Sequence, residues 1–92
     1  MSRHTARKER WTQLNAKEFR SLFGVVHYRA GAWEGTVLFE QLLPEEDGPT
    51  WRPQQLFAGR FKRPRNAMIA VEDKAREVRR RYPDQVRIAF AD

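Results

Sequence analysis

The stretch FAGRFKRPRNAMIAVEDKAREVRRRY, residues 57–82, joins an aromatic segment to a basic turn and then to an amphipathic segment. Small and apolar residues recur in its second half at the i, i+3, i+4 and i+7 spacing of one helix face. These positions are Ala67, Ala70, Val71, Lys74, Ala75, Val78 and Tyr82. Asn66 is the predicted N-cap after the strand-breaking Pro64, so we expect a helix that packs closely on a sheet.

The opposite face of this predicted helix is charged. Its outward positions are Glu72, Asp73, Arg76, Arg79 and Arg80. The acidic residues come first and the arginines come last, which is the order that the helix dipole favours. The dipole alone therefore accounts for the arginines at the end of the helix, without any ligand.

Upstream of the helix, three segments have the composition and alternation of β-strands. The first two, LFGVVHYR (22–29) and WEGTVLFEQL (33–42), are predicted to form a hairpin. The third, QQLFAGRFK (54–62), is expected to begin after Pro53, because proline cannot donate a hydrogen bond to a sheet.

Two weaker signals lie toward the ends of the chain. A capping signature at Asn15 predicts a short helix over 16–21, and QVRIAF (85–90) predicts a final short strand. The expected fold is thus a single α+β domain over 11–92, a small three-stranded antiparallel sheet packed on one amphipathic helix. Residues 1–10 are predicted to be a flexible basic arm.

The bulk composition points to a polyanionic partner. The 18 lysine and arginine residues outnumber the 12 acidic ones, giving a formal net charge of +6. Such a balance favours nucleic acid. The chain has no cysteine, which excludes disulfides, thiolate metal sites and cysteine nucleophiles. The sequence contains no apolar run long enough for a membrane span, so we expect a cytoplasmic protein without a membrane partner.

No catalytic constellation is present. The two histidines, His4 and His27, lie far apart and lack further metal ligands. The acidic residues Glu45, Glu46 and Asp47 are consecutive, so they do not present an acid and a base across a cleft. We therefore expect no enzymatic activity, no cofactor and no metal.

Positive charge is concentrated where the third strand gives way to the helix. Between Trp51 and Arg65 the basic residues are Arg52, Arg60, Lys62, Arg63 and Arg65, with no acid among them. Because positive charge near a helix start is mildly unfavourable, an external anion explains the last four better than folding does. Strand alternation places Arg60 and Lys62 opposite Phe57 and Phe61, which we expect to pack under the helix.

Three tryptophans have to be placed in a small domain. Trp33 is expected in the core, whereas Trp11 and Trp51 border polar segments. Beside Arg52, an exposed Trp51 would stack on bases or anchor a protein interface. The alternative is that each tryptophan covers the edge of a small core.

The segments FGVVHYRAGAWEGTVLF, LFAGRF, AMIAVEDKAREVRRRY and VRIAF, within residues 23–91, resemble the plant ethylene-response-factor (Apetala-type) DNA-binding domain. They are also similar to the related arm-binding domains of phage tyrosine recombinases. The resemblance implies a three-stranded sheet that enters the DNA major groove and is backed by the helix.

Carried over residue by residue, the resemblance makes Trp33 a structural or contact tryptophan. Val26 and Tyr28, with Arg29 nearby, stand where the family has arginines in its first strand, and Leu38 stands at the arginine of its second strand. In the third strand, Gln55 and Phe57 stand where an arginine and a tryptophan are expected. These departures leave the implied fold better supported than the implied base reading.

The sequence thus predicts a non-catalytic nucleic-acid-binding protein, with duplex DNA favoured over RNA. The predicted contacts are Arg29, Arg52, Gln55, Arg60, Lys62, Arg63 and Arg65. The predicted stacking or interface residues are Tyr28, Trp33 and Trp51. The alternative is a protein-interaction module, such as a phage- or plasmid-type inhibitor or adaptor, that docks through its sheet face or an edge strand.

Overall fold

The computed structural model describes residues 11–88, which form six antiparallel strands and one helix. The elements are β1 (Thr12–Asn15), β2 (Glu18–Arg20), β3 (Gly24–Arg29), β4 (Ala32–Leu43), β5 (Thr50–Phe61), α1 (Pro64–Arg81) and β6 (Val86–Arg87). Strands β1 to β5 pair in chain order, and β6 pairs with β4. The α+β class holds, but the predicted three-stranded sheet is wrong, because β1, β2 and β6 extend it. The predicted basic arm, residues 1–10, lies outside the described residues.

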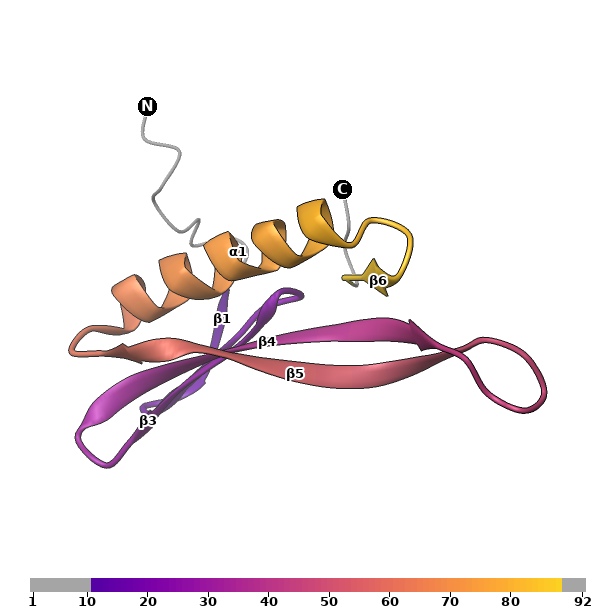
Figure 1. The fold of residues 1–92 in the computed structure, drawn as a ribbon. Helices are drawn as coiled ribbons and strands as arrows, with labels where there is room; N and C mark the ends of the chain where they lie inside the picture. The colour runs from indigo at the N-terminus through magenta and orange to yellow at the C-terminus, as the bar shows by residue number, and fades with distance from the viewer. Residues whose placement is uncertain (1–10, 89–92) are drawn as a thin grey trace.

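The hairpin of β4 and β5 dominates the molecule, with twelve residues in each strand. Trp33 lies opposite Phe61 at one end, and Leu43 lies opposite Thr50 at the other. Figure 1 shows the tip of this hairpin projecting well beyond the helix. Within the described part of the chain, no helix is both long and apolar enough to cross a membrane.

Pro53 lies inside β5, opposite Glu40, and does not mark the start of the strand as expected. The N–H of Leu42 donates to the carbonyl of Gln85, on the side of β4 away from β5 (2.8 Å). Because backbone groups alternate in an antiparallel ladder, Glu40 also faces away from β5 and exchanges no hydrogen bond with Pro53. The backbone nitrogen of Pro53 therefore faces the free edge of the sheet, where no donor is needed.

The other side of β4 is occupied by two strands in succession. β3 lies along its first half, and β6 lies along its second half, where Val86 pairs with Gln41 and Arg87 with Glu40. The predicted final strand, 85–90, is thus observed only as Val86–Arg87 within the described residues.

The predicted helix over 16–21 is wrong, because this segment forms the β1–β2 hairpin. The side-chain Oδ1 of Asn15 accepts a hydrogen bond from the backbone N–H of Lys17 (2.8 Å). This short-range bond closes a turn, and the same kind of side-chain acceptor also caps helices. The capping signature therefore marked a real local hydrogen bond, but the wrong element.

The long helix begins three residues earlier than expected. It starts at Pro64, and no side chain caps its N-terminus at Arg63. Proline suits the first helical position, since its fixed φ is already helical and it has no N–H to satisfy. Asn66 is therefore inside the helix and does not cap it.

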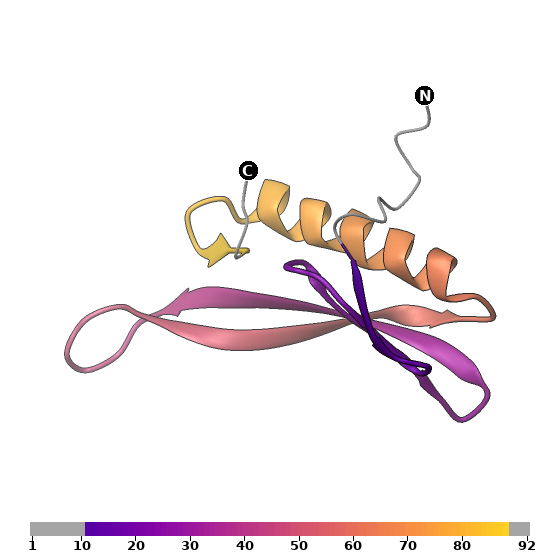
Figure 2. The ribbon, with the colours of Figure 1, turned by 180° about the vertical axis from the view of Figure 1, so that it is seen from behind.

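The helix packs on one face of the sheet and leaves the other face open, as Figures 1 and 2 show from opposite sides. Ala67, Val71 and Ala75 are fully buried against Val26 and Val37 of the sheet. The small alanines allow the helix to lie close to the strands. We refer to the uncovered side of the sheet as the open face.

Glu72 is buried and not exposed as predicted, with 3% of its surface accessible. Its Oε2 accepts a hydrogen bond from the indole Nε1 of Trp11 (2.7 Å), and its Oε1 lies 3.5 Å from Arg76. Trp11 is itself buried, although the sequence placed it beside a polar segment. The carboxylate is thus satisfied by two partners, and it joins the start of the sheet to the middle of the helix.

A β-bulge in β5 changes the face on which its side chains lie. Ala58 is the extra residue between the partners of Gly35 and Thr36. One extra residue reverses the alternation beyond it. Phe57 therefore lies on the open face and is 57% exposed, whereas Phe61 lies on the helix side. The expectation that both phenylalanines pack under the helix is wrong for Phe57.

Candidate nucleic-acid interface

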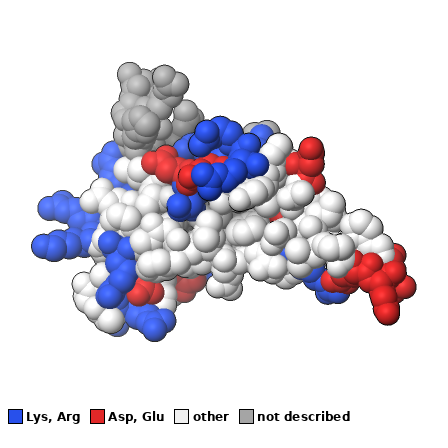
Figure 3. Space-filling model, viewed as in Figure 1, with Lys and Arg blue, Asp and Glu red and all other residues white. Residues whose placement is uncertain are grey.

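Two turns meet at one end of the molecule because Trp33, near the start of β4, pairs with Phe61 at the end of β5. We define the basic end as the four exposed cations on the β3–β4 turn and the β5–α1 junction, Arg29, Lys62, Arg63 and Arg65. Among the described residues, none of these four side chains has a hydrogen-bond or ion-pair partner. Figure 3 shows blue side chains projecting where β5 gives way to α1.

The start of α1 lies at the same end. No side chain caps it, and its first turn contains no acidic residue. The uncapped N–H groups of a helix start carry a partial positive charge. They add to the field of the four side chains, so this end of the molecule attracts anions from two independent sources.

Arg60 is near the basic end, but it is engaged within the protein. One guanidinium nitrogen donates to the carbonyls of Arg29 and Ala30, at 3.3 and 2.9 Å. Its Nε lies 3.4 Å from a carboxylate oxygen of Glu34, its neighbour across the open face. Arg60 therefore braces the β3–β4 turn, where Ala30 has a positive φ of 51°. Its charge is largely balanced by Glu34.

Arg52 lies near the other end of the molecule, close to the tip of the β4–β5 hairpin. It makes a two-pronged contact with Glu45, with both N–O distances at 2.8 Å. The guanidinium holds the pKa of the Glu45 carboxyl below its ordinary value, and the carboxylate raises the pKa of Arg52. The structure thus separates Arg52 from the basic end and neutralises it.

Three acidic side chains gather on the loop at this hairpin tip. We call Glu45, Glu46 and Asp47 the acidic tip. Figure 3 shows these red side chains at the end of the molecule opposite the basic end. Within the described residues Glu46 and Asp47 have no ion-pair partner, so the tip stays negative despite Arg52.

The three aromatic residues proposed for stacking are partly covered by neighbours. The Tyr28 ring packs against the edge of Trp33, with centroids 5.3 Å apart, on the helix side of the sheet. The guanidinium of Arg87 lies 4.3 Å from the centroid of Trp51. Phe57, by contrast, is exposed on the open face, although it was expected to pack under the helix. The β-bulge at Ala58 places it there, and Gly59 is the only sequence signal of that bulge.

Gln55 lies near the middle of the open face, opposite Leu38. It is exposed, and it lies away from both the basic end and the acidic tip. The structure therefore brings together Arg29, Lys62, Arg63 and Arg65, but not Gln55 or Arg52.

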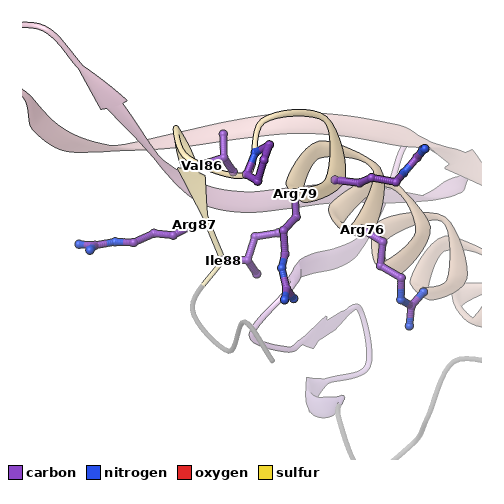
Figure 4. Close-up of a pocket in the computed structure, with 7 residues that line it drawn as sticks. Arg76, Arg79, Val86, Arg87 and Ile88 are labelled. Atoms are coloured by element: carbon purple, nitrogen blue, oxygen red, sulfur yellow. The ribbon is translucent and has the colours of Figure 1, made fainter.

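An open groove of about 760 Å³ lies between the end of α1 and β6. Its lining residues are Arg76, Arg79, Arg80, Pro83, Val86, Arg87 and Ile88. In Figure 4 Arg79 lies beside Ile88, whereas Arg87 points away from both. Arg87 is held by Glu40 (2.7 Å). The chain continues from this groove into residues 89–92, which are not described.

No group of three or more potential metal-ligating side chains occurs among residues 11–88. His27 is exposed on the open face, opposite Glu34. Searches of protein-family models, curated proteins and solved structures find no match to the chain. The resemblance to ethylene-response-factor domains therefore stays a prediction.

Proposed function

We propose that this protein binds nucleic acid through phosphate contacts made by the basic end. The observation that carries the proposal is the gathering of Arg29, Lys62, Arg63 and Arg65 on two adjoining turns without partners among the described residues. Arginine and lysine side chains of this kind supply the sequence-independent part of nucleic-acid affinity. The uncapped start of α1 adds backbone donors of the type that bind phosphate.

Duplex DNA suits this surface better than single strands or RNA loops. Recognition of unpaired bases relies on exposed aromatic platforms. Trp33 packs against Tyr28, and Arg87 lies over Trp51, so both tryptophans are partly covered. On the open face Glu34 and Glu40 engage Arg60 and Arg87, so this face offers phosphate little net positive charge. A duplex therefore contacts the end of the sheet and does not lie across it, and most contacts are to its backbone.

A salt-titrated binding assay tests the proposal. Fluorescence anisotropy with a labelled random duplex compares the parent with a variant in which Arg29, Lys62, Arg63 and Arg65 are all alanine. The slope of log affinity against log salt is expected to fall by about 3–4 in the variant, because each lost phosphate contact removes about 0.9. Thermal unfolding is expected to stay close to that of the parent.

The matched control is Arg79→Ala with Arg80→Ala and Arg81→Ala, which removes exposed charge from the far end of the helix. This variant is expected to keep most of the parent's slope. The proposal fails if the parent does not bind at about 50 mM salt. It also fails if the control loses as much affinity as the basic-end variant.

A further inference from the structure

The open face carries a group of apolar side chains that the helix does not cover, although Arg87 of β6 lies over Trp51. We define the apolar strip as Val25, Leu38, Leu42, Trp51, Pro53 and Phe57. Leu38 and Leu42 alternate along β4 with the buried Val37, so they lie on the open face. The other four lie there because each is paired with an open-face residue of β4, namely Thr36, Glu40 or Leu42. Phe57, at 57% exposed, is its most prominent member.

Opposite charges lie at the two ends of this strip. The basic end is where β4 begins and β5 finishes, and the acidic tip is where β4 finishes and β5 begins. The molecule measures 43 Å along its longest axis. The charges are therefore far apart within one copy, so they do not neutralise each other.

We propose that two copies of the chain pack open face against open face about a two-fold axis, with their β4–β5 hairpins antiparallel. The twelve residues of β4 have their midpoint between Val37 and Leu38, and Leu38 is part of the apolar strip. A two-fold axis near Leu38 lays each strip on the other, with Phe57 close to the centre. The same rotation brings the acidic tip of each copy to the basic end of its partner.

In this arrangement the surface of each copy is complementary to the same surface of the other copy, as a two-fold interface requires. The apolar strips exclude water at the centre, and opposite charges meet at both ends. Packing in parallel would instead bring like charges together. The second copy is thus the occupant that matches both the apolar pattern and the charge pattern of this face.

Pairing through the free edge of β5 is disfavoured. Pro53 has no N–H to donate at that edge, and the bulge at Ala58 interrupts its regular spacing. Natural sheets use both devices against edge-to-edge association. The open face remains the surface on which a second copy can dock.

The size of the face indicates a weak dimer. Twelve residues at about 3.3 Å each make it about 40 Å long, and three strands at about 4.8 Å make it about 14 Å wide. That flat area, on the order of 560 Å², is smaller than the roughly 800 Å² that each partner buries in a standard interface. We expect dissociation in the micromolar range.

This inference does not rest on the proposed function, because it requires only a second copy. Phosphate and the partner's acidic tip compete for the basic end, so the experiment is done without nucleic acid. Sedimentation velocity over a concentration series is expected to show the parent passing from 10.9 kDa to twice that mass. Phe57→Asp is expected to raise the dissociation constant at least about tenfold.

A charge-swap pair tests the antiparallel geometry. One variant carries Glu46→Lys and Asp47→Lys, so its tip and its basic end are both positive. The other carries Lys62→Glu, Arg63→Glu and Arg65→Glu, so only Arg29 stays positive at its basic end and both of its ends are net negative. Each variant alone is expected to stay monomeric at low salt, and an equimolar mixture is expected to form the heterodimer.

Arg79→Glu with Arg80→Glu is the matched control, because it reverses two exposed charges on the helix, away from the open face. It is expected to dimerise like the parent. Circular dichroism checks that every variant is folded. The proposal is overturned if the parent remains monomeric up to about 1 mM at low salt. It is also overturned if the parent dimerises but the mixed charge-swap variants do not.

Discussion

Gly35 lies where the helix packs closely on the sheet. A β-carbon built on Gly35 would stand 2.7 Å from a methyl carbon of Val71 and 3.2 Å from the carbonyl oxygen of Ala67. Both neighbours are fully buried, and valine has few alternative rotamers in a helix. A single missing methyl group thus sets the distance between the helix and β4.

Gly35→Ala is therefore expected to lower the free energy of unfolding by about 1–3 kcal/mol, since the added methyl overpacks a rigid core. Chemical denaturation measures this change. Thr36→Ala, the next position on the same strand but on the open face, is expected to cost less than about 1 kcal/mol. If Thr36→Ala cost as much as Gly35→Ala, the close approach of the helix would not explain the effect.

For single residues, the sequence shows where the charged side chains are but not which hydrogen-bond and ion-pair partners they have in the fold. The positive cluster around Lys62, Arg63 and Arg65 was predictable, because four cations between Gly59 and Asn66 stand out in the sequence. The partners of Arg60 were not predictable, since Glu34 and the carbonyl of Ala30 lie about thirty residues away and meet it only through strand register.

The long strands of the sheet are easier to predict from the sequence than the short ones. β4 and β5 are long, so alternation identified both, although it missed the first part of β5 because Pro53 was taken as a start. β1 and β2 have four and three residues, too few for a period to be recognised, whereas β6 lies within the strand predicted over 85–90. These short strands form because an existing edge offers them hydrogen bonds.

Pro53 protects the free edge of β5, so replacing it has a consequence for association. Pro53→Thr places a backbone donor on that edge while keeping strand propensity. We expect little change in thermal stability but larger and more persistent assemblies at high concentration, measured by light scattering. The control Gln55→Thr alters the next outward-facing residue, which already has an N–H, and is expected to assemble like the parent. Equal assembly by both variants would show that the missing N–H of Pro53 does not prevent association through the free edge of β5.

At the scale of the whole molecule, one helix on one face of a twisted sheet supplies the core. The described core residues are contributed by β3, β4 and α1, together with Trp11, Phe23 and Ile88, which lie just outside the elements. A domain of this size buries little apolar surface on folding, so its free energy of unfolding is small. Each buried position on the helix therefore affects the stability of the entire fold.

Ala75 and Arg79 lie one helical turn apart on α1. A glutamate at each position compares the effect of a new carboxylate at a buried and at an exposed site. Ala75 is fully buried and Arg79 is exposed. Ala75→Glu is expected to cost roughly 3 kcal/mol or more, because it buries an unpaired carboxylate against the sheet. Arg79→Glu is expected to cost well under about 1 kcal/mol. Thermal unfolding measures both, and similar destabilisation by the two variants would contradict the docking of the helix.

The hydrogen bond from Trp11 to Glu72 has a consequence for how the chain folds. It joins residues 61 positions apart, and it fastens the first described residue to the middle of the helix. Closing so long a loop is slow, so the bond forms late, after the local β4–β5 hairpin. During synthesis Trp11 leaves the ribosome long before Glu72, so its indole has no native hydrogen-bond acceptor until the helix has been made. Trp11 is therefore expected to reach its native contact later than the β4–β5 hairpin forms.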